Sequence, residues 1–105
     1  MKEVTVQELK GMMDAKEDFQ LIDVREDYEF ESANLGGELI PLSTILDEAS
    51  RISKDKKVVI HCKAGGRSGI AIGQLETKFG FNNLYNLKGG ILAYKKDIDP
   101  TLDVI

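Results

Sequence analysis

The sequence predicts one α/β domain built on a small parallel sheet. The chain has 105 residues, a length that suits a single domain spanning 1–105. Short apolar runs alternate along it with segments of helical periodicity, which is the pattern of parallel strands connected by helices. The apolar residues of the run 19–24 fall on both faces of a strand, which suits a sheet covered on both sides. We therefore expect about five parallel strands, right-handed crossovers and helices on both faces.

Composition and charge exclude several classes of function. The 18 acidic and 14 basic side chains give a net charge of -4, which disfavours nucleic acid as a partner. No apolar run approaches the ~18 residues of a membrane helix, and the first residues lack the apolar segment of a signal peptide. We expect a cytoplasmic protein, a monomer, with no membrane partner. With one cysteine, Cys62, and one histidine, His61, the chain offers no disulfide and no zinc set, so we expect no metal or organic cofactor.

Five elements are predicted in the first half of the chain. In order, they are a helix from Thr5 to about Ala15, a strand over 19–24, a short acidic helix over 27–33, a brief strand at 39–40 and an amphipathic helix over 42–52. Thr5 and Glu8 have the spacing of a capping box, which begins the first helix. The Gly36-Gly37 pair ends the acidic segment. Apolar residues at offsets 0, 3, 4, 7 and 10 from Leu42 predict the amphipathic helix, with Ser43 placed to cap its start.

The second half contains the clearest strand and a long helix. The predicted elements are a strand over 58–61, a helix over 68–79, a strand over 84–87, a helical turn or two over 91–96 and an irregular tail over 97–105. The first of these is a β-branched run, and Gly80 is placed to stop the long helix. Gly69 and Gly73 lie inside that helix, where each costs about 1 kcal/mol relative to alanine, so we expect close backbone packing around them.

Polar residues follow two of the predicted strands, at the edge where parallel sheets bind ligands. The first grouping is Asp23 with Arg25. The second is a loop that joins a buried strand to a helix and consists of Cys62, Lys63, Ala64, Gly65, Gly66, Arg67 and Ser68. The glycines allow successive backbone N–H groups to converge, which makes an anion-binding nest at the start of a helix.

Cys62 is the predicted nucleophile, since its thiol begins this nest. Cysteines at helix N-termini or beside cations have pKa values lowered from ~8.5 to between ~3.5 and ~7.5. A helix dipole alone supplies ~0.3 to 2 kcal/mol, so we expect the loop N–H groups and the charge of Lys63 or Arg67 to supply the rest. A buried cysteine that only fills space is the common alternative. Two glycines and two cations add nothing to packing, and we expect such a loop to expose the thiol.

The neighbours of Cys62 leave alternatives open. Lys63 either attracts an anionic donor or is an ordinary solvated lysine. Arg67 either pairs with a carboxylate or holds the charge of a donor. Ser68 either hydrogen-bonds the thiolate or caps the helix, and we favour the cap. Alternation along the strand turns His61 to the face opposite Cys62, where we expect a packed or partly exposed side chain.

Four motifs together resemble a single-domain rhodanese over nearly the whole chain. They are the segment 21–26, the Ile40-Pro41 turn, the segment 58–68 and the segment 87–90, in that order. The sequence departs from the family pattern at 33–35, where Ala-Asn-Leu replaces a common Gly-His-Ile, and at Tyr94, where tryptophan is common.

The resemblance implies a rhodanese fold and a sulfurtransferase. Cys62 would take a sulfane sulfur from a small donor such as thiosulfate, hold it as a persulfide and pass it to a thiophilic acceptor, either a thiol or a protein. The residues from Lys63 to Arg67 would cradle the outer sulfur, with Arg67 part of the loop architecture. Asp23 and Arg25 would form a structural pair beside the site.

Two rival functions remain. One rival is a phosphatase or arsenate reductase of the related type. Cysteine phosphatases use His-Cys-x5-Arg, whereas here only four residues separate Cys62 from Arg67. One residue spans up to ~3.6 Å of chain, so the shorter loop tightens the ring of N–H groups and suits a single sulfur better than a phosphate. The other rival is a module without enzymatic activity that carries sulfur or binds a partner.

Overall fold

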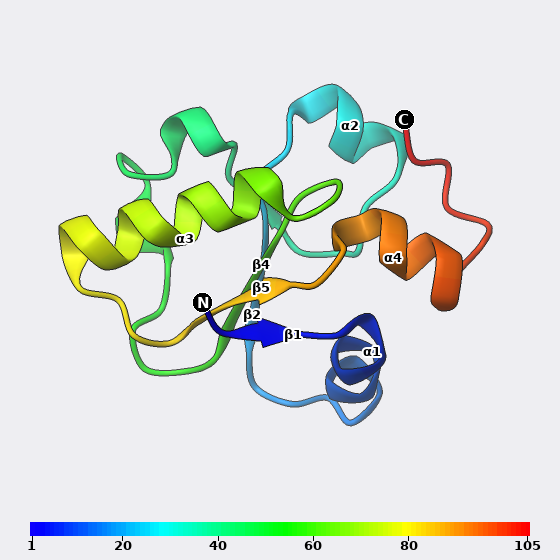
Figure 1. Cartoon of the computed structure of the whole chain (residues 1–105), viewed down its shortest axis with the longest axis horizontal. Coiled ribbons are helices and arrows are strands. Elements are labelled where there is room, and N and C mark those ends of the chain that lie inside the picture. The colour runs from blue at the N-terminus through cyan, green and yellow to red at the C-terminus, as the bar shows by residue number, and fades with distance from the viewer.

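The computed structural model describes all 105 residues and places a parallel sheet between two helical layers (Figure 1). Five strands pair in the order β1-β5-β4-β2-β3. The strands are β1 (Glu3–Val4), β2 (Gln20–Asp23), β3 (Glu38–Leu39), β4 (Val58–His61) and β5 (Leu84–Leu87). The helices are α1 (Val6–Asp14), α2 (Asp27–Ser32), α3 (Gly66–Phe79) and α4 (Gly90–Asp97). The predicted α/β class with its parallel sheet is confirmed. No helix has both the length and the apolarity needed to cross a bilayer.

Each face of the sheet buries its own apolar cluster, because successive side chains of a strand point to opposite faces. Ile60 of β4 packs with Ile72 of α3 on one face. Val59, the preceding residue, packs with Leu9 of α1 and Ile91 of α4 on the other. Figure 1 shows α3 on one side of the strands and α1 with α4 on the other. The β-branched run of β4 is therefore buried from both sides, as its sequence predicts.

Local signals set the ends of two helices. Thr5 Oγ1 accepts a hydrogen bond from Glu8 N at 3.0 Å, and Glu8 Oε1 accepts from Thr5 N at 2.9 Å, which completes the predicted capping box of α1. Gly80 ends α3 at φ 69°, a left-handed conformation that glycine adopts without strain.

The amphipathic helix predicted over 42–52 is wrong. This segment forms two 3-10 turns, Leu42–Thr44 and Ala49–Arg51, separated by further turns. Its apolar periodicity still serves packing, because Ile45 and Ile52 are buried in the α3-side cluster. Serine, threonine and aspartate are weak helix formers, and a helix of about eleven residues is marginal without strong propensity. Apolar spacing therefore identified the buried face and not the hydrogen-bond pattern.

Further differences concern strand β1 and the glycines inside α3. Strand β1 was not predicted, since two residues carry too little pattern to be recognised. The expected close packing at Gly73 is wrong, because a Cβ there would meet no atom within 4 Å. At Gly69 a Cβ would make ordinary contacts of 3.6 Å. The segment after α4 has no regular structure, although Leu102 and Val104 pack against the core.

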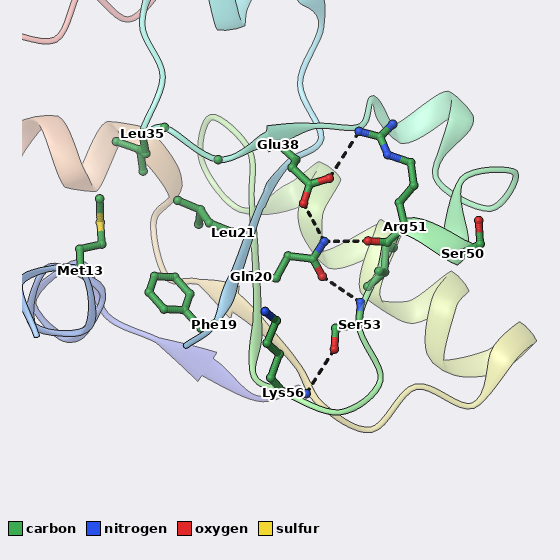
Figure 2. Close-up of a pocket in the computed structure, with 13 residues that line it drawn as sticks. Met13, Phe19, Gln20, Leu21, Leu35, Glu38, Ser50, Arg51, Ser53 and Lys56 are labelled. Carbon is green, nitrogen blue, oxygen red and sulfur yellow. Dashed lines mark hydrogen bonds and ion pairs between the residues drawn. The ribbon is translucent and has the colours of Figure 1, made fainter. Parts of the chain in front are cut away.

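A hollow of about 660 Å³ lies beside the amino ends of β2 and β3 (Figure 2). Its polar wall is organised by Gln20, whose amide donates to Glu38 Oε1 at 2.9 Å and to the Arg51 carbonyl at 2.7 Å. Gln20 Oε1 accepts from Ser53 N at 2.8 Å. The Gln20 side chain thus ties the irregular 42–52 segment to the sheet, at the edge opposite the Cys62 loop.

Candidate active site

The Cys62 loop begins where β4 ends and returns its backbone onto the sulfur. Gly65 has φ 112°, a left-handed conformation that strongly favours glycine. This turn directs the Gly65 N–H at Cys62 Sγ, with a nitrogen to sulfur distance of 3.1 Å. Helix α3 then starts at Gly66. Of the loop N–H groups expected at the thiol, that of Gly65 makes a hydrogen bond to the sulfur.

Ser68 lies in the first turn of α3 and contacts the sulfur from the helix side. Its Oγ is 3.3 Å from Cys62 Sγ. The favoured capping role is wrong, because Gly65 is the N-cap residue and Ser68 is already inside the helix. The Ser68 hydroxyl instead points toward Cys62, the Gly65 carbonyl and Asn86 Oδ1. Of the two alternatives, the structure favours contact with the sulfur.

The loop lowers the pKa of the Cys62 thiol. Burial acts to raise this pKa, since it disfavours a charged sulfur. Hydrogen bonds from the Ser68 side chain and from the backbone N–H groups of Ser68, Gly65 and Ala64 act the other way and outweigh it. We expected the charge of Lys63 or Arg67 to contribute to the lower Cys62 pKa, and in the structure these hydrogen bonds lower it. The net direction favours the thiolate, which is the nucleophilic form.

The expectation of an exposed thiol is wrong, because Cys62 is only 1% exposed. The loop folds over the sulfur, and the side chain joins the apolar cluster on the α3 side of the sheet with Ile60 and Ala71. The sulfur therefore lies beneath the loop, 3.1 Å from Gly65 N and 3.3 Å from Ser68 Oγ.

Arg67 forms an ion pair with Glu29 of α2. Nη1 is 2.6 Å from Oε1 and Nη2 is 2.9 Å from Oε2, a bidentate geometry. The hydrogen bond from Arg67 holds the pKa of Glu29 at about 2, well below its usual value. Of the two alternatives for Arg67, the structure contains the carboxylate pair. Sequence reasoning missed Glu29, because it is one of several acidic residues in a charged segment.

The N-terminus of α4 supports the start of the loop. Ile91 N donates to the Cys62 carbonyl at 3.0 Å, and Leu92 N donates to the Lys63 carbonyl at 3.1 Å. Gly90 has φ 62°, and a Cβ there would lie 2.4 Å from the Lys63 carbonyl oxygen. Glycine at this position lets two backbone segments touch. The motif at 87–90 thus leads into a helix that holds the Cys62 and Lys63 carbonyls, while the Gly65 N–H of the same loop points at the sulfur.

Asp23 and Arg25 form a fully buried ion pair at the carboxyl end of β2. Arg25 Nη2 lies 2.8 Å from Asp23 Oδ2 and also donates to the Ala33 carbonyl at 2.7 Å. His61 lies in register with Asp23 on the neighbouring strand, with Nε2 3.7 Å from Asp23 Oδ2. Burial lowers the pKa of His61, which keeps the ring neutral. His61 is buried on the face of β4 opposite Cys62, as strand alternation predicts.

The remaining predicted residues lie within the loop. Lys63 is partly exposed and makes no ion pair. Ala64 and Gly66 are exposed. Asn86 of β5 was not predicted, yet it contacts both Ser68 and the Gly65 carbonyl. Its one signal in the sequence is an amide side chain within an otherwise apolar strand. No three His, Cys, Asp or Glu side chains are grouped to hold a metal ion.

Comparison with known proteins identifies the domain family of the chain. The Rhodanese-like domain family matches residues 5–97 of the chain. The rhodanese-like/PpiC domain-containing protein 12 of Arabidopsis thaliana, a chloroplastic protein, is 36% identical over 97% of this chain and 36% of its own length. The probable adenylyltransferase/sulfurtransferase MoeZ of Mycobacterium tuberculosis is 33% identical over 94% of this chain and 26% of its own length. The chain belongs to the rhodanese-like domain family.

Solved structures resemble the whole chain. A rhodanese-like domain protein from Staphylococcus aureus is 31% identical, covers 100% of this chain and 99% of its own, and superposes with a TM-score of 0.84. SSP1007 from Staphylococcus saprophyticus is also 31% identical, with coverage of 93% and 97% and a TM-score of 0.82. By contrast, the chain spans about a third or less of the two curated relatives named above. The likeness therefore concerns a domain that also occurs within longer proteins.

Proposed function

We propose that this domain is a sulfurtransferase that carries sulfane sulfur on Cys62. The observation that carries the proposal is the placement of the Gly65 N–H and the Ser68 hydroxyl within hydrogen-bond distance of the Cys62 sulfur in a rhodanese-like domain. Hydrogen-bond donors placed around a thiolate stabilise its negative charge before the sulfur-donating substrate binds. The same hydrogen-bond donors would stabilise the negative charge of a persulfide anion on Cys62.

The proposed reaction has two steps. The Cys62 thiolate attacks the sulfane sulfur of thiosulfate, a new S–S bond forms, and sulfite leaves with the electron pair of the broken bond. An acceptor thiolate, or cyanide in the assay, then attacks the outer sulfur, and the Cys62 thiolate leaves. Both steps conserve charge and electrons without a resident cofactor. The partly exposed Lys63 is placed to attract the anionic donor, while Arg67 holds the loop through Glu29.

The acceptor is proposed to be a small thiol or a protein thiol. Cys62 is the single cysteine of the chain, so no second thiol is present to receive the sulfur. One relative has adenylyltransferase and sulfurtransferase in its name, which supports a protein partner as an option. A monomeric state and a cytoplasmic location stay predictions.

Thiocyanate formation from thiosulfate and cyanide tests the proposal. We expect turnover by the unaltered protein and by a Ser50→Ala control, whose hydroxyl lies at the opposite edge of the sheet. We expect none from Cys62→Ser. Turnover by Cys62→Ser would overturn the mechanism.

Two further assays test the rivals. Hydrolysis of a small aryl phosphate at a rate exceeding sulfur transfer would favour a phosphatase. Loading of Cys62 by a protein persulfide donor, with negligible turnover of thiosulfate, would favour a carrier that has no enzymatic activity. Either result would overturn the proposed sulfurtransferase activity in favour of the corresponding rival function.

A further inference from the structure

The Ser68 hydroxyl has one proton and three neighbours able to accept it. Its Oγ lies 2.6 Å from Asn86 Oδ1, 3.2 Å from the Gly65 carbonyl oxygen and 3.3 Å from Cys62 Sγ. A hydroxyl donates one hydrogen bond and accepts others. The shortest of the three contacts is the one to Asn86, so the amide oxygen is the strongest competitor for this proton.

The orientation of the Asn86 amide is fixed by the loop. Nδ2 donates to the Gly65 carbonyl at 3.1 Å. A flipped amide would place an oxygen against that carbonyl oxygen and would lose this hydrogen bond. The side chain is buried between β5 and the start of α3, at 6% exposure. Asn86 Oδ1 therefore faces Ser68 and acts there as an acceptor only.

The two protonation states of Cys62 use the Ser68 proton differently. With a neutral thiol, S–H donates to Ser68 Oγ and the Ser68 hydroxyl donates to Asn86, so both bonds are made. With a thiolate, Ser68 must turn its proton to the sulfur, and the bond to Asn86 is lost. We propose that Asn86 is a positioning residue that competes with Cys62 for the Ser68 proton and thereby limits the thiolate population. This inference rests on the proposed function, in which the thiolate is the nucleophile.

Charged groups around Cys62 do not act through Asn86. Arg67 of α3 is paired with Glu29 of α2. His61 and the Asp23–Arg25 pair lie on the opposite face of the sheet, and the first turn of α4 contains no acidic side chain. Lys63, the next residue along the chain, is a further charged group, and the N-terminal residue Met1 reaches Asn86 through its Sδ, 3.6 Å from Nδ2. None of the charged side chains bonds to Asn86 or Ser68, so a substitution at Asn86 leaves their contacts in place.

A double-mutant cycle separates this role from mere support of the loop. The four proteins are the unaltered chain, Asn86→Leu, Ser68→Ala and the double variant. The rate of Cys62 alkylation by iodoacetamide is measured against pH, which gives the thiol pKa without any sulfur transfer. We expect Asn86→Leu to lower this pKa by about 0.4 to 1, the equivalent of one net hydrogen bond. Ser68→Ala raises it, and the double variant matches Ser68→Ala.

A different pattern of pKa shifts would overturn the proposal. If Asn86→Leu shifts the pKa as much in the Ser68→Ala background as alone, or shifts it upward, Asn86 acts through the Gly65 carbonyl and the proposal is wrong. Asn86→Asp, whose side chain has the same shape as asparagine, is the second variant to measure if Asn86→Leu does not fold. We expect Asn86→Asp to raise the Cys62 pKa by more when Ser68 is present than in the Ser68→Ala background. Equal shifts would overturn the proposal, whereas absence of thiocyanate formation by the unaltered protein would count against the proposed function.

Discussion

Arg67 and Glu29 join α3 to α2 through two parallel hydrogen bonds of 2.6 Å and 2.9 Å. Glu29 Oε1 also accepts from Glu26 N at 3.0 Å, so the carboxylate is held by the first turn of its own helix. Arg67 is the last residue of the Cys62 loop before Ser68. The ion pair therefore anchors the loop at the point where it becomes helix.

Removing this carboxylate is expected to cost stability above about pH 5. Folding lowers the pKa of Glu29 from 4.5 to about 2, so its stabilisation is complete above the unfolded value and is lost as pH falls from about 4.5 toward 2. Because Arg67 is 35% exposed, solvent weakens the pair, and we expect Glu29→Gln to cost about 1 to 2 kcal/mol. Urea unfolding at about pH 7 and about pH 3 measures the loss and its decline in acid.

Glu31→Gln is the matched control on the same helix. Glu31 is exposed and makes no ion pair, so its substitution is expected to change stability by less than about 0.5 kcal/mol. Equal losses from the two variants, or a loss for Glu29→Gln that does not shrink in acid, would show that the pair does not hold the loop.

Gly65 and Gly66 are adjacent but are expected to respond in opposite ways to alanine. At Gly65, φ 112° makes a Cβ strained, and we expect a cost of about 1 to 3 kcal/mol and a higher Cys62 pKa as the N–H leaves the sulfur. At Gly66 a Cβ meets nothing within 4 Å, and we expect a gain of about 0.5 to 1 kcal/mol. Unfolding free energies and alkylation profiles measure both. Indistinguishable variants would contradict the described turn.

Gly90 is expected to be the least replaceable glycine of the site. Alanine there would bring its Cβ to 2.4 Å from the Lys63 carbonyl oxygen and would strain φ 62°, so we expect a loss of about 3 kcal/mol. Gly73→Ala is the control, since the space around it is open and alanine favours the interior of a helix by about 1 kcal/mol. Thermal unfolding should separate the two variants. A stable Gly90→Ala protein would mean that α4 does not touch the loop.

Sequence reasoning predicted the features that depend on local chemistry. The β-branched run of β4, the capping box at Thr5 and the left-handed end of α3 at Gly80 each have one physical cause within a few residues. The Cys62 loop was recognised for the same reason, because its glycines and cations are contiguous.

The features that were missed depend on residues far apart in the chain. Glu29 lies 38 positions from Arg67, and Asn86 lies 18 positions from Ser68, so neither partner could be identified by spacing. The 42–52 segment shows that burial can follow a helical period without helical hydrogen bonds. The burial of Cys62 arises because the loop folds back over the sulfur, which composition does not reveal.

The most direct test of a sulfur-carrying Cys62 is the intact mass of the protein after incubation with thiosulfate and removal of the excess. We predict a gain equal to one sulfur atom, which disappears when cyanide or a small thiol is added. Protein alkylated at Cys62 beforehand, and the Cys62→Ser variant, should gain nothing, since the chain has no other cysteine. An unchanged mass in the unaltered protein, or the same gain in the blocked protein, would contradict the account.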